Sequence, residues 1–213
     1  MVNQALLFLG DAMRVHDLIT AFADRDILPI KVADVARLIM EAGIEEEICF
    51  IEVDIDTSIL RGFIVQTTEP RGIYDANGNG RISKIYHGTN QNLQWQRLVC
   101  CKELLHVLDE TWQRAATPEE VSGLVKKMAL PPRFQIPNDG TDDNRKALFD
   151  RVGALQAVAV LFPIAIRELL LSKHQEGVLA DDEIVHIVGL PQVYVRLVMS
   201  EFWPKIHQAL STL

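Results

Sequence analysis

The sequence predicts an α+β protein with N-terminal helices, a small antiparallel β-sheet and a helical C-terminal half. Apolar residues first recur at helical spacing and then alternate with polar residues over 48–56. Two more strand-like segments follow before position 89, and helical spacing then returns. The chain has 213 residues, so one large domain or two small ones can bury a hydrophobic core.

Residues 4–23 and 31–42 are predicted to be helices, because their apolar side chains recur every three or four positions. Gly43 provides a stop for the second helix. We assign residues 1–28 to an N-terminal helical segment and residues 29–213 to the main domain. The N-terminus has no basic stretch before its apolar residues and no small-residue cleavage site, so we expect a mature helix rather than a signal peptide.

Three segments are predicted to be strands: 48–56, 61–68 and 81–89. The first alternates Ile51, Val53 and Ile55 with acidic residues, which is typical of a half-buried strand. Between the second and third, "DANGNG" (75–80) begins like a calcium-binding loop. Position 12 of that loop is Tyr86 instead of a bidentate glutamate, and the flanks have strand patterns. A glycine-rich hairpin turn is therefore the favoured interpretation.

The second half is predicted to be helical. A helix is expected over 93–110, and Thr117, Pro118 and Glu120 form a capping box that begins another. A loop rich in Pro, Gly and Asp follows at 130–144. A long helix is expected over about 142–173, then two short helices near 181–188 and 191–199, and a tail to 213.

Composition excludes several classes of protein. The net charge is −8, which opposes binding to nucleic acid through a general positive field. No apolar run approaches the roughly 20 residues of a membrane span. The three cysteines, Cys49, Cys100 and Cys101, do not suggest a disulfide framework. These features favour a cytoplasmic protein that is associated with neither nucleic acid nor membrane.

The segment "QRLVCCKELLH" (96–106) carries the pattern with the most chemistry. A helix with His-Glu-x-x-His holds zinc through two histidines one turn apart, and its glutamate activates the bound water. Here the frame is Lys-Glu-Leu-Leu-His, so Lys102 replaces the first histidine. Residues three or four apart share a helix face, which predicts one stripe containing Trp95, Val99, Lys102 and His106.

Residues 82–109 resemble the core of the ImmA/IrrE-type zinc metallopeptidase domain. In that family a strand ending in an Ile-Tyr-type pair precedes a helix that carries the His-Glu-x-x-His motif. The residues that carry the resemblance are Gln96, Arg97, Leu98, Glu103, Leu104 and His106. Downstream, "ALQAVAVLFP" (154–163) is similar to the family's next helix, and 181–199 resembles the short helices after it. The resemblance implies a zincin-like scaffold.

The resemblance also implies roles for particular residues. Glu103 would be the general base and His106 a zinc ligand, while the acidic third ligand would fall near Asp150. A lysine ammonium has no lone pair for a metal, so only two ligands remain where a catalytic zinc needs three. We therefore expect the Lys102 ammonium to occupy the position of the metal and to pair with Glu103 or Asp150. The alternative is that Lys102 and His106 are ordinary surface residues. Cys101, beside this face, is a further candidate pocket residue.

Other chemistry is less well supported. Glu103/His106 and Glu183/His186 are two Glu-x-x-His segments, as in di-iron bundles. Such a bundle needs helices in the first half of the chain, where strands are predicted. Residues 181–200 have helix-turn-helix spacing, although the second helix offers little to contact DNA. A thiol nucleophile at Cys100 or Cys101 would have His87 or His106 as its partner, but we favour a role for both cysteines as small buried hydrophobes.

The leading hypothesis is a catalytically degenerate metallopeptidase-like protein that binds a protein partner and needs no cofactor. The resemblance implies a regulatory setting, because active members cleave repressor-type proteins in stress responses or mobile elements. One alternative is an active zinc metallopeptidase with a site remodelled on Glu103, His106 and Asp150. Others are a helix-turn-helix transcription regulator and an interaction module that uses the scaffold for unrelated binding.

Overall fold

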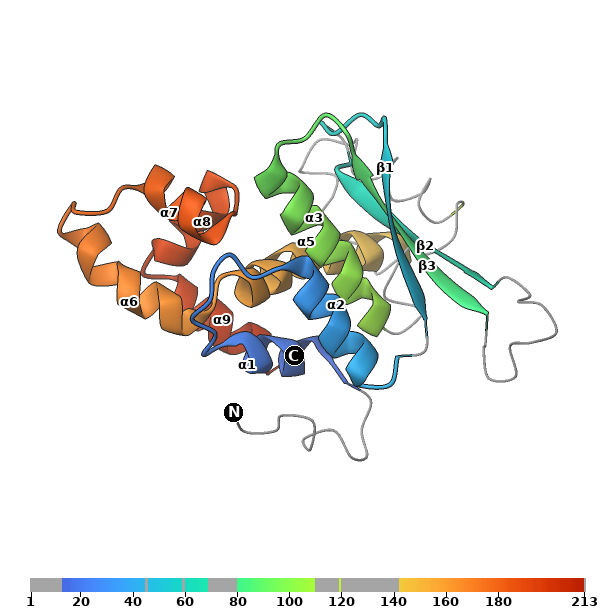
Figure 1. Ribbon diagram of the computed structural model, residues 1–213, viewed down its shortest axis with the longest axis horizontal. Helices are drawn as coiled ribbons and strands as arrows, with labels where there is room; N and C mark the ends of the chain where they lie inside the picture. Colours follow the sequence, from blue (N-terminus) through green and yellow to red (C-terminus); the bar gives the residue numbers. More distant parts are fainter. Residues whose placement is uncertain are drawn as a thin grey trace.

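The computed structural model describes residues 13–44, 46–58, 60–68, 80–109, 119 and 142–212, with the backbone alone for 142–149. It confirms the α+β class: N-terminal helices, a three-stranded sheet and a helical C-terminal half (Figure 1). The elements in chain order are α1 (Val15–Phe22), α2 (Val32–Glu41), β1 (Glu47–Val53), β2 (Gly62–Thr68), β3 (Arg81–Gly88), α3 (Leu93–Leu105), the 3₁₀-helix η2 (His106–Leu108), α5 (Asp142–Leu161), α6 (Ile164–Gln175), α7 (Asp181–Val188), α8 (Gln192–Met199) and α9 (Trp203–Leu210).

The sheet is mixed, which corrects the prediction of an antiparallel sheet. Its strand order is β1-β3-β2, with β1 parallel and β2 antiparallel to the central β3. Tyr86 of β3 therefore has Ile51 and Phe63 as its neighbours, and its ring stacks on that of Phe63 at 4.8 Å. Apolar alternation identifies a strand and its faces but not its neighbour or direction, so the sequence could not exclude this order.

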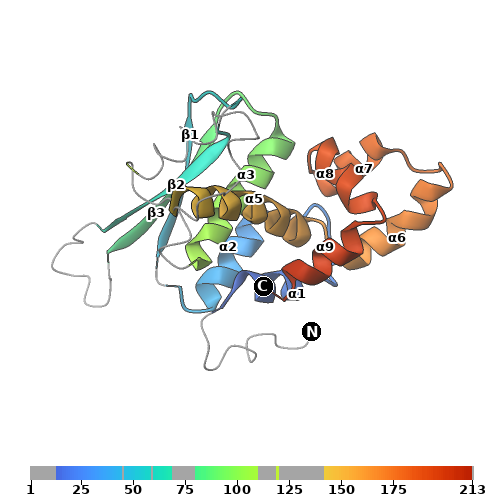
Figure 2. The same ribbon diagram turned by 180° about the vertical axis from the view of Figure 1, so that it is seen from behind.

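Helix α3 packs against β2 and β3 of the sheet and also against α5, which crosses it in both views of the molecule (Figures 1 and 2). On the sheet side it covers Ile64 and Ile85. Gly62 permits the close approach, because a Cβ there would lie 2.3 Å from Cγ1 of Val99. A helix packed on two sides buries most of its circumference, so charged residues of α3 are drawn into the interior.

The predicted helix over 142–173 is two helices. Pro163 separates α5 from α6, and the axes bend by 77°. Proline has no backbone N–H and disfavours helical conformation in the residue before it, which explains the break. Within the described parts of the chain, no single helix is long and apolar enough to cross a membrane, and only this bent pair meets the criteria jointly.

The first and last described helices join the same core. Leu18, Ile19 and Phe22 of α1 are buried in the cluster that also contains α5 residues. The predicted C-terminal tail instead forms α9, whose Trp203 is fully buried. Proline at the second position of α9 suits a helix start. The domain boundary at residue 28 stays a prediction.

Most other predicted boundaries agree with the structure. Helix α2 ends before Gly43, which has a φ of +91°, and the two short helices near 181–188 and 191–199 are present as α7 and α8. The predicted loop overlaps α5, which already begins at Asp142, and its residues 130–141 lie outside the described residues. Residues 4–12 of the first predicted helix also lie outside the described residues. So does the helix expected at Thr117, apart from Glu119, which is helical.

Candidate functional site

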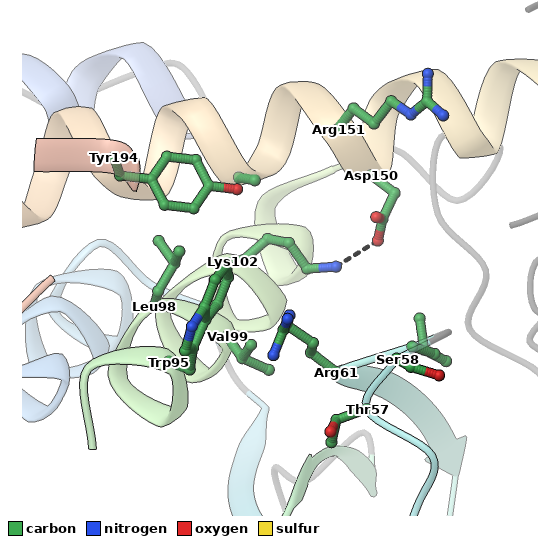
Figure 3. Close-up of a pocket in the computed structure, with 12 residues that line it drawn as sticks. Thr57, Ser58, Arg61, Trp95, Leu98, Val99, Lys102, Asp150, Arg151 and Tyr194 are labelled. Carbon is green, nitrogen blue, oxygen red and sulfur yellow. Dashed lines mark hydrogen bonds and ion pairs between the residues drawn. The ribbon is translucent and has the colours of Figure 1, made fainter. Parts of the chain in front are cut away.

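Helix α3 places one row of side chains against a cavity. The helix is capped by Asn92, whose side chain accepts a hydrogen bond from the backbone N–H of Trp95 at 3.0 Å. Trp95, Val99 and Lys102 follow at helical spacing and all line the cavity (Figure 3). The α-helix ends at Leu105, so His106 begins a 3₁₀ turn and not the last α-helical turn that was predicted.

Lys102 is buried and forms ion pairs with two carboxylates. Its ammonium contacts Asp150 of α5, and it lies 2.7 Å from Oε1 of Glu103 (Figure 3 shows the first contact). The side chain of Lys102 is 10% exposed and that of Glu103 3%. Burial by itself lowers the pKa of Lys102, but Asp150 and Glu103 outweigh it and hold that pKa above its ordinary value. Lys102 is therefore a charged, internal ammonium at neutral pH.

Asp150 is the matching anion. Burial favours its neutral form, but the positive charges of Lys102 and His106 lower the pKa of its carboxyl below the ordinary value. Its side chain is 13% exposed and reaches α3 from the neighbouring helix α5. Both acidic residues predicted as partners of Lys102, Asp150 and Glu103, form ion pairs with its ammonium.

His106 belongs to the same cluster but is oriented by another acid. Its Nδ1 lies 2.5 Å from Oδ2 of Asp109. Burial lowers the pKa of His106, but the hydrogen bond to Asp109 and the charge of Glu103 outweigh it and raise that pKa. The other side of the ring faces α5 at Gly153, where a Cβ would lie 3.2 Å from Nε2. Gly153 thus leaves space for the imidazole.

The donors at this cluster do not fit a catalytic zinc ion. The cluster consists of Lys102, Glu103, His106 and Asp150. Of these, Lys102 is protonated and has no lone pair to donate to a metal. Its ammonium already contacts Asp150, which would have to serve as a ligand. Among the described residues, no group of three His, Cys, Asp or Glu side chains is arranged to hold a metal ion.

The cavity beside Lys102 encloses about 290 Å³ and lies between α3, α5, α8 and the segment before β2. It is lined by Thr57, Ser58, Leu60, Arg61, Trp95, Leu98, Val99, Lys102, Asp150, Arg151, Ala154 and Tyr194. The guanidinium carbon of Arg61 lies 3.8 Å from the ring centroid of Trp95, and Tyr194 meets the same indole edge-on. The sequence did not single out Arg61, because a lone arginine before a strand has no local pattern.

Cys101 does not line this cavity, which corrects its assignment as a pocket residue. It is fully buried within the hydrophobic core, about 100° round the helix from Lys102. Burial raises the pKa of both Cys100 and Cys101 to about 12. A thiol nucleophile requires a lowered pKa, so neither cysteine is suited to that role.

The helix pair α7–α8 is attached to the core. Gly189 in the turn is left-handed, and Arg97 of α3 donates to the backbone carbonyls of Val188 and Gly189. On α8, Arg196 pairs with Asp181 and Gln192 with Asp182. The second helix offers three polar side chains that could contact DNA, Gln192, Tyr194 and Arg196. Two of them are engaged with acidic residues, and the third, Tyr194, lines the cavity.

The remaining motifs provide no second site among the described residues. Glu183 caps α7 by accepting a hydrogen bond from the N–H of Ala180, and His186 is exposed, so they lie apart from Glu103 and His106. The segment flanking "DANGNG" forms β2 and β3, two antiparallel strands, as predicted. Of the motif itself, Gly80 has a φ of +60° and residues 75–79 lie outside the described residues.

Comparisons of this chain with protein families, with curated proteins and with solved structures find no match.

Proposed function

We propose that this chain is a catalytically degenerate, ImmA/IrrE-like metallopeptidase that works in the cytoplasm by binding a protein partner in a regulatory setting. The observation that carries the proposal is the position of Lys102. Its buried ammonium contacts Asp150, the residue that the resemblance makes a metal ligand, and Glu103, which it makes the general base. One fixed positive charge thus compensates the two carboxylates that a metal would otherwise compensate.

The neighbouring residues support the same interpretation. His106 is buried beside Glu103, and Asp109 fixes its ring through Nδ1. An orienting carboxylate is typical of a metal-binding histidine. The cluster therefore has the residues of a zincin-like site, apart from the first ligand, and an internal cation at its centre.

An active peptidase remodelled on Glu103, His106 and Asp150 is less well supported. Zinc would have to displace the Lys102 ammonium from Asp150 and would leave that ammonium buried without its partner. A transcription regulator is also less well supported, because Gln192 and Arg196 are engaged within the α7–α8 pair.

Metal content tests the proposal. The wild-type protein is purified without added zinc and measured by elemental analysis beside a chelator-treated sample. We expect both samples to contain far less than one metal ion per chain. About one tightly held zinc or iron ion per untreated chain would overturn the proposal, because the ion would need the ligands that Lys102 now contacts.

A further inference from the structure

The cavity beside the Lys102 cluster contains a guanidinium group that has no counter-ion among the described residues. Within the described residues, the Arg61 guanidinium forms no hydrogen bond or ion pair, and its contact is the face of Trp95. Its backbone is fixed, because the Arg61 carbonyl accepts hydrogen bonds from Gln91 Nε2 at 2.6 Å and Gly88 N at 3.2 Å. An arginine stacked on an indole loses little further freedom when it binds an anion.

The other charged groups of the cavity have partners. Lys102 contacts Asp150 and Glu103, and the positive charge of Arg151 acts on Asp150. An incoming anion would therefore meet a compensated Asp150 and an uncompensated Arg61.

Tyr194 supplies a second polar group on the opposite wall. Figure 3 shows Tyr194 on the α8 side of the cavity and Arg61 on the sheet side. The Tyr194 hydroxyl forms no hydrogen bond with the described residues. Burial raises the pKa of Tyr194, so the phenol keeps its proton at neutral pH and can donate.

The rest of the wall is largely apolar and includes Leu60, Leu98, Val99 and Ala154. The volume of about 290 Å³ is near the lower end for small-molecule sites. A single guanidinium matches one planar carboxylate through two parallel hydrogen bonds.

We infer that this cavity binds a carboxylate with an apolar body, which places its carboxylate on Arg61 and Tyr194 and its body against the apolar wall. The carboxylate can come from the C-terminal residue of a peptide or from a free small acid. The inference rests on the proposed function in one respect: a peptide source would make this cavity part of the partner-binding surface.

The first test is a titration with 3-phenylpropionate and with its uncharged amide. The reporter is the Trp95 indole N–H signal in ¹⁵N-labelled protein, assigned with W95F. We expect saturable shifts, with the acid bound at least about tenfold more tightly than the amide, because only the acid forms charge-assisted bonds to Arg61. Equal binding of acid and amide, or no binding of the acid, would overturn the inference.

Variants then assign the carboxylate contact. R61Q is expected to weaken binding of the acid by about tenfold or more without changing that of the amide, and R61K to restore part of the loss. Y194F is expected to weaken binding by a few-fold through one lost hydrogen bond, and it keeps the test valid if R61Q does not fold. R37Q is the control, since Arg37 is an exposed residue of α2. Undiminished binding by folded R61Q and by Y194F contradicts the site.

A third arm distinguishes the sources. Acetyl-Ala-Ala-Phe with a free carboxylate is compared with the same peptide as an amide. Tighter binding of the free peptide than of phenylpropionate identifies a peptide terminus, and weaker binding identifies a small acid. Metal content is measured separately. About one metal ion per chain would overturn the proposed function without affecting the result of the Arg61 titration. Failed titrations would overturn the carboxylate site without affecting the assignment of Lys102 as an internal cation.

Discussion

The ammonium of Lys102 in α3 pairs with the carboxylate of Asp150 in α5, and both side chains are almost fully buried. The pair joins two helices that are distant in sequence, and Glu103 adds a second carboxylate 2.7 Å from the same ammonium. A buried charge is costly unless it is paired, so each group depends on the others for its ionised form. The central cluster is therefore coupled and is expected to respond as a unit.

Breaking the Lys102–Asp150 pair should destabilise the protein strongly. We expect K102M and D150N each to lower the free energy of unfolding by about 3 kcal/mol, because the remaining charge is left buried without its partner. The double variant should lose clearly less than the sum of the two. Urea unfolding at neutral pH measures all three. The exposed pair Arg37–Asp34 is the control, where R37A should cost less than about 1 kcal/mol. Additive losses at Lys102 and Asp150 would show that they do not interact.

Acid should remove the contribution of Asp150. Its folded-state pKa lies below the ordinary value of 3.8, so its charge stabilises the fold above pH 3.8. That stability is lost as the pH falls through the folded-state pKa, because the folded protein must then take up the proton. The difference in unfolding free energy between wild type and D150N should be largest near neutral pH and should narrow below pH 3.8. A difference that stays constant down to pH 2 would contradict the assigned shift.

The effect of G153A on the free energy of unfolding should change sign when the His106 ring is removed. In the wild type, G153A should cost about 1–3 kcal/mol of stability, because its Cβ would lie 3.1–3.2 Å from the imidazole. In an H106A background the space is open, and the same change should stabilise the helix by about 0.5–1 kcal/mol. Thermal or urea unfolding of the four proteins gives both values. The same sign in both backgrounds would mean that the ring does not limit this position.

The thiols of Cys100 and Cys101 should be unreactive in the folded protein. A pKa of about 12 leaves about a thousandfold less thiolate near pH 7 than the ordinary value of 9.0. Iodoacetamide labelling followed by peptide mass spectrometry should modify both residues only when denaturant is present. Rapid modification of either cysteine in native buffer would reopen the possibility of a thiol nucleophile.

Much of the local structure could be predicted from the sequence. Helical spacing predicts α2, α3, α7 and α8. Alternation predicts β1, and the segments predicted as the other two strands form β2 and β3. The stripe of Trp95, Val99 and Lys102 followed from the same spacing, and the structure brings Lys102 and Asp150 together as expected. These features depend on residues close in sequence, or on a resemblance that pairs two distant segments.

The errors concern information that local patterns do not contain. Strand order and direction depend on which strands pair, and alternation is the same for parallel and antiparallel neighbours. Arg61 lines the cavity because the segment between β1 and β2 passes beside α3, and no sequence motif predicts that position. Asp109 could have been anticipated, because it lies three residues after His106. Proline chemistry alone predicts the break at Pro163, so one continuous helix over 142–173 disagrees with the sequence as well as with the structure.

The most direct test of the internal cation is to restore the missing ligand. K102H recreates His-Glu-x-x-His beside Asp150, and K102Q removes the ammonium without supplying an imidazole. Zinc binding is measured by calorimetry on folded, metal-free protein. The account predicts about one zinc ion per chain for K102H, lost again in K102H/H106Q, and no specific zinc binding by K102Q or wild type. A folded K102H that binds no more zinc than K102Q would contradict the claim that Lys102 occupies the position of a metal.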